Sequence, residues 1–192
     1  EDIMGEQLYQ ELYQSILEEH KKVFEKQDLE ELKKFINIIK LSHRIFVLGV
    51  GREGIAGRAF SMRLMHLGKE VHWVWDDTTP GMEKGDLCIL ITGSGKIGHL
   101  DYIADQAKKA NATLAVVTGT PEEKTPKKAD YVLFIPAAVF NGTDSRVIET
   151  IQPMGNLFEQ HAFILFDIIV MLLEKDMKIS YECMERRHRN IE

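Results

Sequence analysis

The fold class of this 192-residue chain is decided by residues 87–96, Leu87-Cys88-Ile89-Leu90-Ile91-Thr92-Gly93-Ser94-Gly95-Lys96. The first five residues form an uninterrupted apolar run, which predicts a β-strand buried on both faces of a parallel sheet. The next five supply two glycines, two hydroxyl groups and a cation, and a helical pattern begins near Ile97. A buried strand that ends in such a turn directs backbone N–H groups and the positive end of a helix toward one place. The stretch therefore predicts an anion site, with phosphate as the expected ligand, although a plain strand-to-helix turn would also need glycine.

Strand and helix patterns alternate on both sides of this stretch. Apolar strand patterns cover 44–48, 71–75, 113–118 and 131–135, and helical patterns cover about 55–66 and 100–110. Strands that alternate with helices predict right-handed crossovers and a mostly parallel, doubly wound sheet of the α/β class.

Helical segments flank the predicted sheet at both ends of the chain. Two amphipathic helices come first, over about 5–24 and from Leu29 to Ile39, and Asp28 with Glu31 forms a candidate capping box for the second. We expect the first helix to pack on another subunit or, as an equal alternative, across its own sheet. After a linker over 136–155, Asn156 is expected to cap an apolar helix over 157–173. The chain is expected to form one domain over 1–192, with helices in 1–41, the sheet in 44–135 and helices in 156–192.

Composition excludes several classes of protein. Hydrophobic residues make up 44% of the chain and charged residues 28%, as in a soluble globular protein. The net charge of -6 argues against nucleic acid as a partner. The longest apolar run, 162–173, is interrupted by Asp167 and is short for a bilayer span, so no membrane partner is expected. The two cysteines have no CxxC spacing, which favours a cytoplasmic location, and the histidines show no metal-ligand spacing.

The sequence Gly49-x-Gly51-x-x-Gly54 matches the dinucleotide-binding fingerprint, with Asp76 at a suitable distance downstream. Against a nicotinamide enzyme, a second glycine-rich turn follows the strand over 87–91, and the chain leaves no room for a separate substrate domain. A Walker A motif is excluded at Lys96, because Ile97 stands where the hydroxyl that binds Mg²⁺ is required. No nucleotide or metal cofactor is expected.

Charged residues near the predicted strand ends are candidates for the site. Arg52 and Lys96 follow two different strands and reach the same carboxyl edge if those strands are parallel. Glu159 lies at the start of an apolar helix, where a carboxylate either stabilises the helix N-terminus or serves as a proton acceptor. His188 lies in a polar tail and, by pattern alone, is a surface residue.

Four stretches together resemble the sugar isomerase (SIS) domain family, and within it the 6-phospho-3-hexuloisomerase branch. The resemblance covers the chain from about Arg44 to its C-terminus. The stretches are 49–52 with 59–68, 92–95, Ile151-Gln152-Pro153-Met154-Gly155-Asn156-Leu157-Phe158-Glu159-Gln160, and His188-Arg189-Asn190-Ile191-Glu192.

This resemblance implies a flavodoxin-like SIS fold, in which a five-stranded parallel sheet lies between helices in three layers, and a homotetramer without a metal or nucleotide. It implies interconversion of a 3-keto hexulose 6-phosphate and fructose 6-phosphate through an enediolate. Glu159 would be the base between C2 and C3, and His188 would move protons among the oxygens, across a subunit boundary. The resemblance also implies which residues hold the phosphate and the sugar hydroxyls. They are Gly51, Arg52, Thr92, Gly93, Ser94 and Gly95, together with Lys96, the cation that follows the glycine turn.

Four positions depart from that branch: Glu53, Lys96, Ile97, and His99, which replaces a small hydroxyl residue. Glu53 stands where the family has serine, and Lys96-Ile97 stand where it has an acidic residue and threonine. Glu53 brings a negative charge toward an expected phosphate unless Arg52 or Lys96 pairs with it. Two functions follow from the sequence: a phosphosugar isomerase, or a non-catalytic sugar-phosphate-binding domain that senses or regulates.

Overall fold

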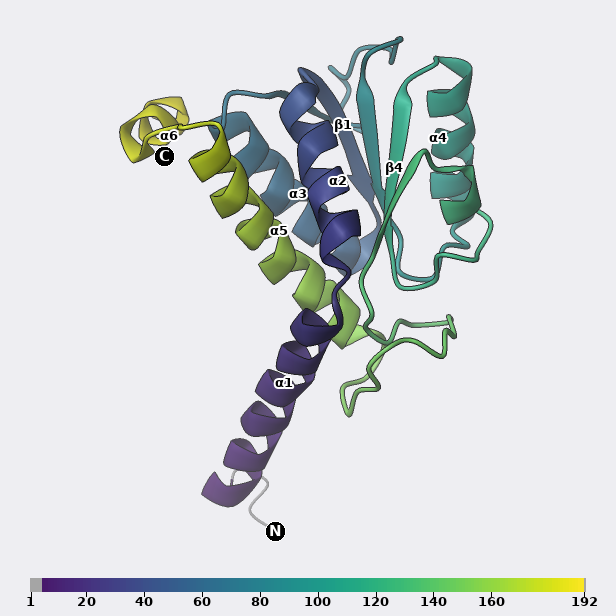
Figure 1. Cartoon of the computed structure of the whole chain (residues 1–192), viewed down its shortest axis with the longest axis vertical. Helices are drawn as coiled ribbons and strands as arrows, with labels where there is room; N and C mark the ends of the chain where they lie inside the picture. Colours follow the sequence, from purple (N-terminus) through teal and green to yellow (C-terminus); the bar gives the residue numbers. More distant parts are fainter. Residues whose placement is uncertain (1–4, 192) are drawn as a thin grey trace.

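Five parallel strands form one sheet at the centre of the protein, in a computed structural model that describes residues 5–191 (Figure 1). The strand order is β2-β1-β3-β4-β5. The strands are β1 (Arg44–Gly49), β2 (Glu70–Trp73), β3 (Leu87–Ile91), β4 (Thr113–Thr118) and β5 (Tyr131–Phe134). The predicted α/β class with a parallel sheet is confirmed, and β3 lies in the middle with all five residues buried, as its apolar run predicts.

Helices cover both faces of the sheet and complete three layers. On one face lie α2 (Leu29–Leu41), α3 (Gly51–His66) and α5 (Asn156–Asp176), and on the other lies α4 (Gly98–Lys109) (Figure 1). A short 3₁₀ turn, η1 (Pro126–Lys128), precedes β5, and α6 (Tyr181–Arg187) packs across the end of α3. This arrangement follows from the crossovers, because β1-α3-β2 and β3-α4-β4 place their helices on opposite faces.

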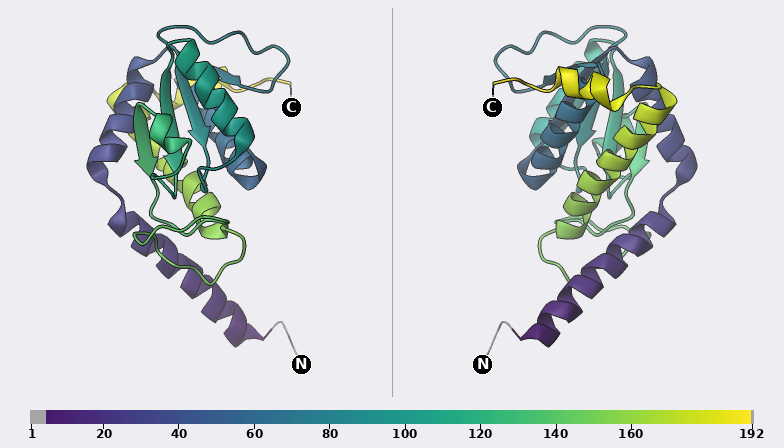
Figure 2. Two further views of the ribbon diagram at one scale, coloured as in Figure 1. Left: turned by 90° about the vertical axis from the view of Figure 1, so that its right-hand side faces the viewer. Right: turned by 90° about the vertical axis from the view of Figure 1, so that its left-hand side faces the viewer.

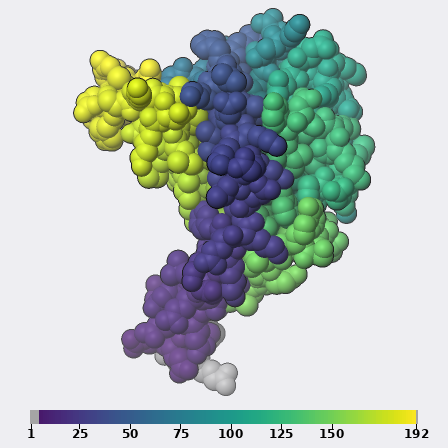
Figure 3. Space-filling model, viewed as in Figure 1, coloured from purple at the N-terminus to yellow at the C-terminus, as the bar shows by residue number. Residues whose placement is uncertain are grey.

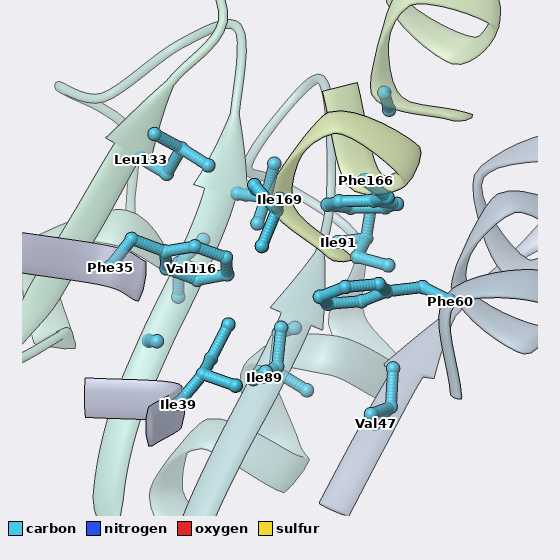
Figure 4. Packing of buried hydrophobic residues seen from close by; sticks show 14 of the residues in the cluster. Phe35, Ile39, Val47, Phe60, Ile89, Ile91, Val116, Leu133, Phe166 and Ile169 are labelled. Carbon is cyan, nitrogen blue, oxygen red and sulfur yellow. The ribbon is translucent and has the colours of Figure 1, made fainter. Parts of the chain in front are cut away.

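The core between the sheet and its α2-α3-α5 layer is built from aromatic and branched side chains (Figure 4). The rings of Phe60 on α3 and Phe166 on α5 stack with their centroids 4.4 Å apart. Ile89 and Ile91 of β3 lie beneath them and are fully buried. This contact fixes the two helices whose first turns form the candidate site.

Two of the differences from the predicted element boundaries bear on the site. Strand β2 ends at Trp73 rather than at residue 75, so Trp73 is buried and Trp75 is exposed. Helix α3 begins at Gly51, four residues before the predicted Ile55. Glycine allows this early start, because a Cβ atom on Gly54 would lie only 2.6 Å from the carbonyl oxygen of Gly49. The glycines of the fingerprint therefore let α3 pack closely on β1.

Of the predicted helix caps, the Asp28 cap is confirmed, and the capping box and the Asn156 cap are not. The Asp28 side chain accepts the N–H groups of Glu30 (2.8 Å) and Glu31 (3.0 Å) at the start of α2. The capping box is wrong, because the Glu31 carboxylate instead accepts the N–H of Phe134, 3.1 Å away on β5. The Asn156 cap is also wrong: Gly155 is the N-cap of α5, with a φ of 79° that favours glycine, and Asn156 is the first helical residue.

Helix α1 (Glu6–Lys26) projects away from the rest of the molecule (Figures 2 and 3). Only its C-terminal part is anchored, where His20 and Val23 are buried near α5. The projecting part exposes Leu8, Leu12 and Leu17. Packing of α1 across its own sheet is therefore wrong, and packing on another subunit stays a prediction.

Helix α5 is a core helix. Within residues 5–191 it is the one helix long and apolar enough to cross a bilayer by length and composition, and it spans 21 residues where the sequence predicted a helix over 157–173. Leu165, Phe166 and Ile169 are, however, buried against the sheet and α3. The burial of these side chains explains the apolar sequence.

Candidate active site

The candidate site lies at the carboxyl edge of the sheet. β1 runs into the first turn of α3, and β3 runs into the segment 92–97 that precedes α4. The start of α5 reaches the same edge, because the Phe158 ring lies beside both Gly93 and Gly119. Ligands of doubly wound sheets bind at this edge, because loops and helix N-termini converge there.

The centre of the site is an ion pair between Arg52 and Glu159. The Arg52 Nε–H donates to Glu159 Oε2, which joins the first turn of α3 to the first turn of α5. The Glu159 side chain is 16% exposed and that of Arg52 57% exposed, so the carboxylate is sheltered while the guanidinium faces solvent. The glycine pattern predicted Arg52 in a loop, but α3 begins at Gly51 and Arg52 lies on this helix instead.

A pocket of about 360 Å³ adjoins this pair. Arg52 and Glu159 supply its charged wall, and Ile55, Phe163 and Ile164 supply an apolar wall. A carboxylate beside an apolar surface is suited to accept a proton from carbon, because water competes less for it there. The cation beside it can stabilise an oxygen that gains negative charge during the reaction.

The predicted phosphate segment is held in place by its own hydrogen bonds. The hydroxyl oxygen of Thr92 accepts the N–H of Gly95 at 3.1 Å. The carbonyl oxygen of Gly93 accepts the hydroxyl groups of Thr118 (3.1 Å) and Thr120 (2.8 Å) from the β4 side. Thr92 is fully buried and Ser94 half-buried at this edge. The segment is thus a fixed element of the site rather than a free loop.

Lys96 follows β3 at the predicted edge of the sheet, and its ammonium group is held by a carboxylate there. Its ammonium group forms an ion pair with Glu123 at 3.0 Å, beyond the end of β4. Arg52 and Lys96 reach the same edge of the sheet, but each is paired with a different carboxylate. Neither cation compensates the charge of Glu53.

Glu53 is the most unusual residue of the site. Its Oε1 accepts the N–H of Gly93 at 2.8 Å, while Oε2 is buried without a hydrogen-bond partner in the described structure. Burial raises the pKa of Glu53 to about 7; the Gly93 N–H opposes this shift and the negative charge of Glu159 adds to it. The carboxyl group of Glu53 thus accepts the backbone N–H of Gly93, which was predicted from the sequence to bind the phosphate of the ligand.

His188 lies far from Glu159 within the chain. Its ring stacks against that of His66, at the C-terminal end of α3, with centroids 5.4 Å apart. Arg52 lies at the opposite end of this 16-residue helix, about 20 Å away at 1.5 Å per residue. The structure brings Gly51, Arg52, Thr92, Gly93, Ser94, Gly95 and Glu159 to one edge, and does not bring His188 to them.

Thr118 and Thr120, which fix the position of Gly93, were not predicted as site residues from the sequence. The signal was present, because Thr118 ends the buried strand β4 just as Thr92 follows β3. The same argument that selected Thr92 would have selected Thr118.

The chain is similar to known proteins over most of its length. The family model described as SIS domain matches residues 38–151. The chain is 36% identical to the 3-hexulose-6-phosphate isomerase of Bacillus subtilis (strain 168), over 85% of this chain and 88% of the relative. It is 38% identical to that of Mycobacterium gastri, over 78% of this chain and 74% of the relative.

A solved structure is similar over nearly the whole chain. It is a Methanococcus jannaschii protein whose crystal structure led to an inferred function of 3-hexulose-6-phosphate isomerase. It superposes with a TM-score of 0.82 at 30% identity, covering 95% of this chain and 99% of the other. The fold is that of a parallel α/β domain, and the chain belongs to the SIS domain family.

Proposed function

We propose that this protein is a sugar-phosphate isomerase that interconverts 3-hexulose 6-phosphate and fructose 6-phosphate. Relatives at 36% and 38% identity bear that activity in their names and cover most of the chain. The observation that carries the proposal is the sheltered Glu159 carboxylate, held beside Arg52 at the carboxyl edge of the sheet.

The proposed chemistry uses Glu159 as the base. In the 3-keto sugar the C2 hydrogen is acidic, because the neighbouring carbonyl at C3 accepts the electron pair. Glu159 takes the C2 proton and an enediolate forms across C2 and C3. Return of a proton to C3 and transfer of the hydroxyl proton from O2 to O3 leave the carbonyl at C2, which is fructose 6-phosphate. Every atom is retained, so the reaction needs no redox partner.

The other site residues bind and orient the sugar in this proposal. Arg52 stabilises the negative oxygen of the enediolate, because a guanidinium offers directed N–H donors. Thr92, Ser94 and the backbone of Gly51, Gly93 and Gly95 hold the phosphate and hydroxyl groups, with Lys96 at the rim. This assignment rests on their shared edge and on the known preference of anions for helix N-termini.

His188 is proposed to move protons between O2 and O3 in the site of a neighbouring subunit. Its separation from Glu159 within one chain supports a role across a subunit boundary. The exposed leucines on α1 support a closed homo-oligomer, a dimer or a tetramer, because apolar patches of this kind are rare on monomers. We further propose that residues 1–192 form a single SIS domain and act in the cytoplasm, which fits two unpaired cysteines.

A coupled assay tests the function. The enzyme is incubated with 3-hexulose 6-phosphate, and fructose 6-phosphate is detected through conversion to glucose 6-phosphate and reduction of NADP⁺. Steady production of NADPH is expected, at a rate proportional to enzyme concentration. If no turnover occurs while fructose 6-phosphate still raises the melting temperature, the chain is instead a sugar-phosphate sensor. The negative charge of Glu53 at Gly93 is the observation that favours this second function.

A further inference from the structure

Two cations and two backbone N–H groups at the carboxyl edge are already paired within residues 5–191. Arg52 donates to Glu159, Lys96 pairs with Glu123, and the Gly93 N–H is taken by Glu53. The Gly95 N–H donates to the hydroxyl oxygen of Thr92. An anion that uses any of these four donors must therefore displace an internal acceptor or share its donor.

Among these acceptors, Glu53 is the one that lies against the glycine turn. A Cβ atom built on Gly93 would lie 2.7 Å from Glu53 Oε1, 2.9 Å from the side chain of Val139 and 3.1 Å from that of Phe158. The carboxyl group therefore sits in a partly apolar recess above the turn. Its second oxygen is buried there without a hydrogen-bond partner among residues 5–191, which is costly for an ionised carboxylate.

We propose that the Glu53 carboxylate is an internal occupant of the anion subsite and competes with the phosphate of the sugar for the Gly93 N–H. The ligand binds to the form of the site in which Glu53 carries a proton. The inference rests on the proposed function for the identity of the ligand. It assigns to Glu53 a role in selecting when the site accepts a phosphorylated sugar.

Two physical effects act in the same direction. An ionised Glu53 repels a phosphate dianion at short range and holds the Gly93 N–H through a charge-assisted hydrogen bond. A protonated Glu53 removes the repulsion, weakens its hold on that N–H and offers an O–H donor from Oε2 to a phosphate oxygen. A site that depended on serine here would show neither effect.

The charged groups around Glu53 do not cancel the effect of its ionisation on phosphate binding. Arg52 on its own helix is paired with Glu159 of α5, whose negative charge adds to the repulsion. Lys96 of the segment 92–97 is neutralised by Glu123 from beyond β4. The segment 135–155 contributes Val139, which is apolar. The charge on Glu53 therefore sets the local preference for a dianion.

The size of the effect follows from the burial of Glu53. With a pKa of about 7, the protonated fraction falls from about nine tenths at pH 6 to about one tenth at pH 8. The dissociation constant of the wild type should then rise about tenfold over that interval, beyond any change due to the ligand. Ionisation of the phosphate itself, near pH 6, affects every variant equally and cancels in ratios.

The experiment measures fructose 6-phosphate binding by isothermal titration calorimetry at pH 6, 7 and 8. The wild type is compared with Glu53→Gln, which keeps the shape and loses the charge, and with Glu53→Ser. Glu122→Gln is the matched control, because this exposed residue follows β4 and its change removes the same charge. Circular dichroism melts confirm that each variant is folded.

The expected result is a ratio of wild-type to Glu53→Gln dissociation constants that grows about tenfold from pH 6 to pH 8, with Glu53→Ser behaving alike and Glu122→Gln behaving as wild type. A ratio that stays constant with pH would overturn the proposal, and so would absence of binding by all of the proteins. Binding with this pH pattern but without turnover of 3-hexulose 6-phosphate would keep the role of Glu53 and refute the isomerase function. Turnover of 3-hexulose 6-phosphate together with a ratio of dissociation constants that does not change with pH would support the isomerase function and refute the role of Glu53.

Discussion

Replacement of Glu159 by glutamine separates a structural role of this residue from a catalytic one. The change preserves the size of the side chain and removes its charge. It breaks the ion pair with Arg52, whose side chain is 57% exposed, so solvent screening limits the loss to about 0–1 kcal/mol. The favourable interaction of a carboxylate with the start of α5 adds about 0.3–1 kcal/mol. Together these losses lower the melting temperature of a domain of this size by about 2–4 °C per kcal/mol.

The catalytic consequence is far larger if Glu159 removes the C2 proton. Loss of a positioned base lowers kcat by about 10²–10⁴-fold, which corresponds to about 3–5 kcal/mol of barrier. Stability and activity therefore respond on different scales, and one variant reports both. Affinity for the sugar phosphate should change little, because glutamine fills the same volume.

The assay compares kcat for 3-hexulose 6-phosphate, the melting temperature and the dissociation constant of fructose 6-phosphate. Glu149→Gln is the control, because Glu149 is an exposed carboxylate in the segment 135–155 and its loss should leave kcat unchanged. A Glu159→Gln enzyme with kcat within a few-fold of wild type would show that Glu159 only stabilises the helix start. The reaction would then need a different base.

Three further predictions concern assembly and stability. Leu12→Glu places a charge on the exposed apolar face of α1 and should reduce the mass measured by light scattering, whereas a wild type that is already monomeric would refute the proposed oligomer. Phe166→Ala removes a fully buried ring of the core and should cost about 3–5 kcal/mol in urea unfolding; a loss below about 1 kcal/mol would contradict the packing. Burial raises the pKa of Asp101, but the hydrogen bonds and charges of Lys124 and Lys128 outweigh it, so the pKa is lowered below 3.8. The stabilising effect of ionised Asp101 is therefore present above pH 3.8 and is lost as the pH falls through the lower pKa of the folded state. Asp101→Asn should have a smaller free energy of unfolding in urea at pH 7, and this free energy should decrease less than that of the wild type as the pH is lowered. If the free energy of unfolding of the variant falls at acidic pH as steeply as that of the wild type, the ion pairs of Asp101 contribute nothing to stability.

The order of elements could be predicted from sequence because each strand is a short apolar run bounded by glycine or polar residues. β3 and β4 have the predicted bounds, 87–91 and 113–118. The start of α3 could not be predicted, since the contact of Gly54 with Gly49 that allows it is a tertiary one. The partner of Glu31 could not be predicted either, because its carboxylate accepts the N–H of Phe134 on β5, which is distant in the sequence.

For the site, sequence could place residues at an edge but could not assign their partners. Parallel topology is enough to bring Arg52 and Thr92 to one edge, whereas Glu159 follows no strand directly and its contact with Arg52 is a tertiary one. The pairing of Lys96 with Glu123 and of Glu53 with Gly93 depends on side-chain directions that no periodicity encodes. His188 shows the same limit, because its distance from Glu159 depends on the path of α5 and α6 back along α3.

Deuterium exchange into fructose 6-phosphate tests the central claim most directly. The wild-type enzyme is incubated with fructose 6-phosphate in D₂O, and loss of the proton signals is followed by ¹H NMR. An enediolate across C2 and C3 predicts exchange of the proton on C3 while the protons on C1 are retained, and Glu159→Gln should abolish the exchange. Exchange at C1, or no exchange at C3 while the ligand is bound, would contradict the proposed function and the role of Glu159.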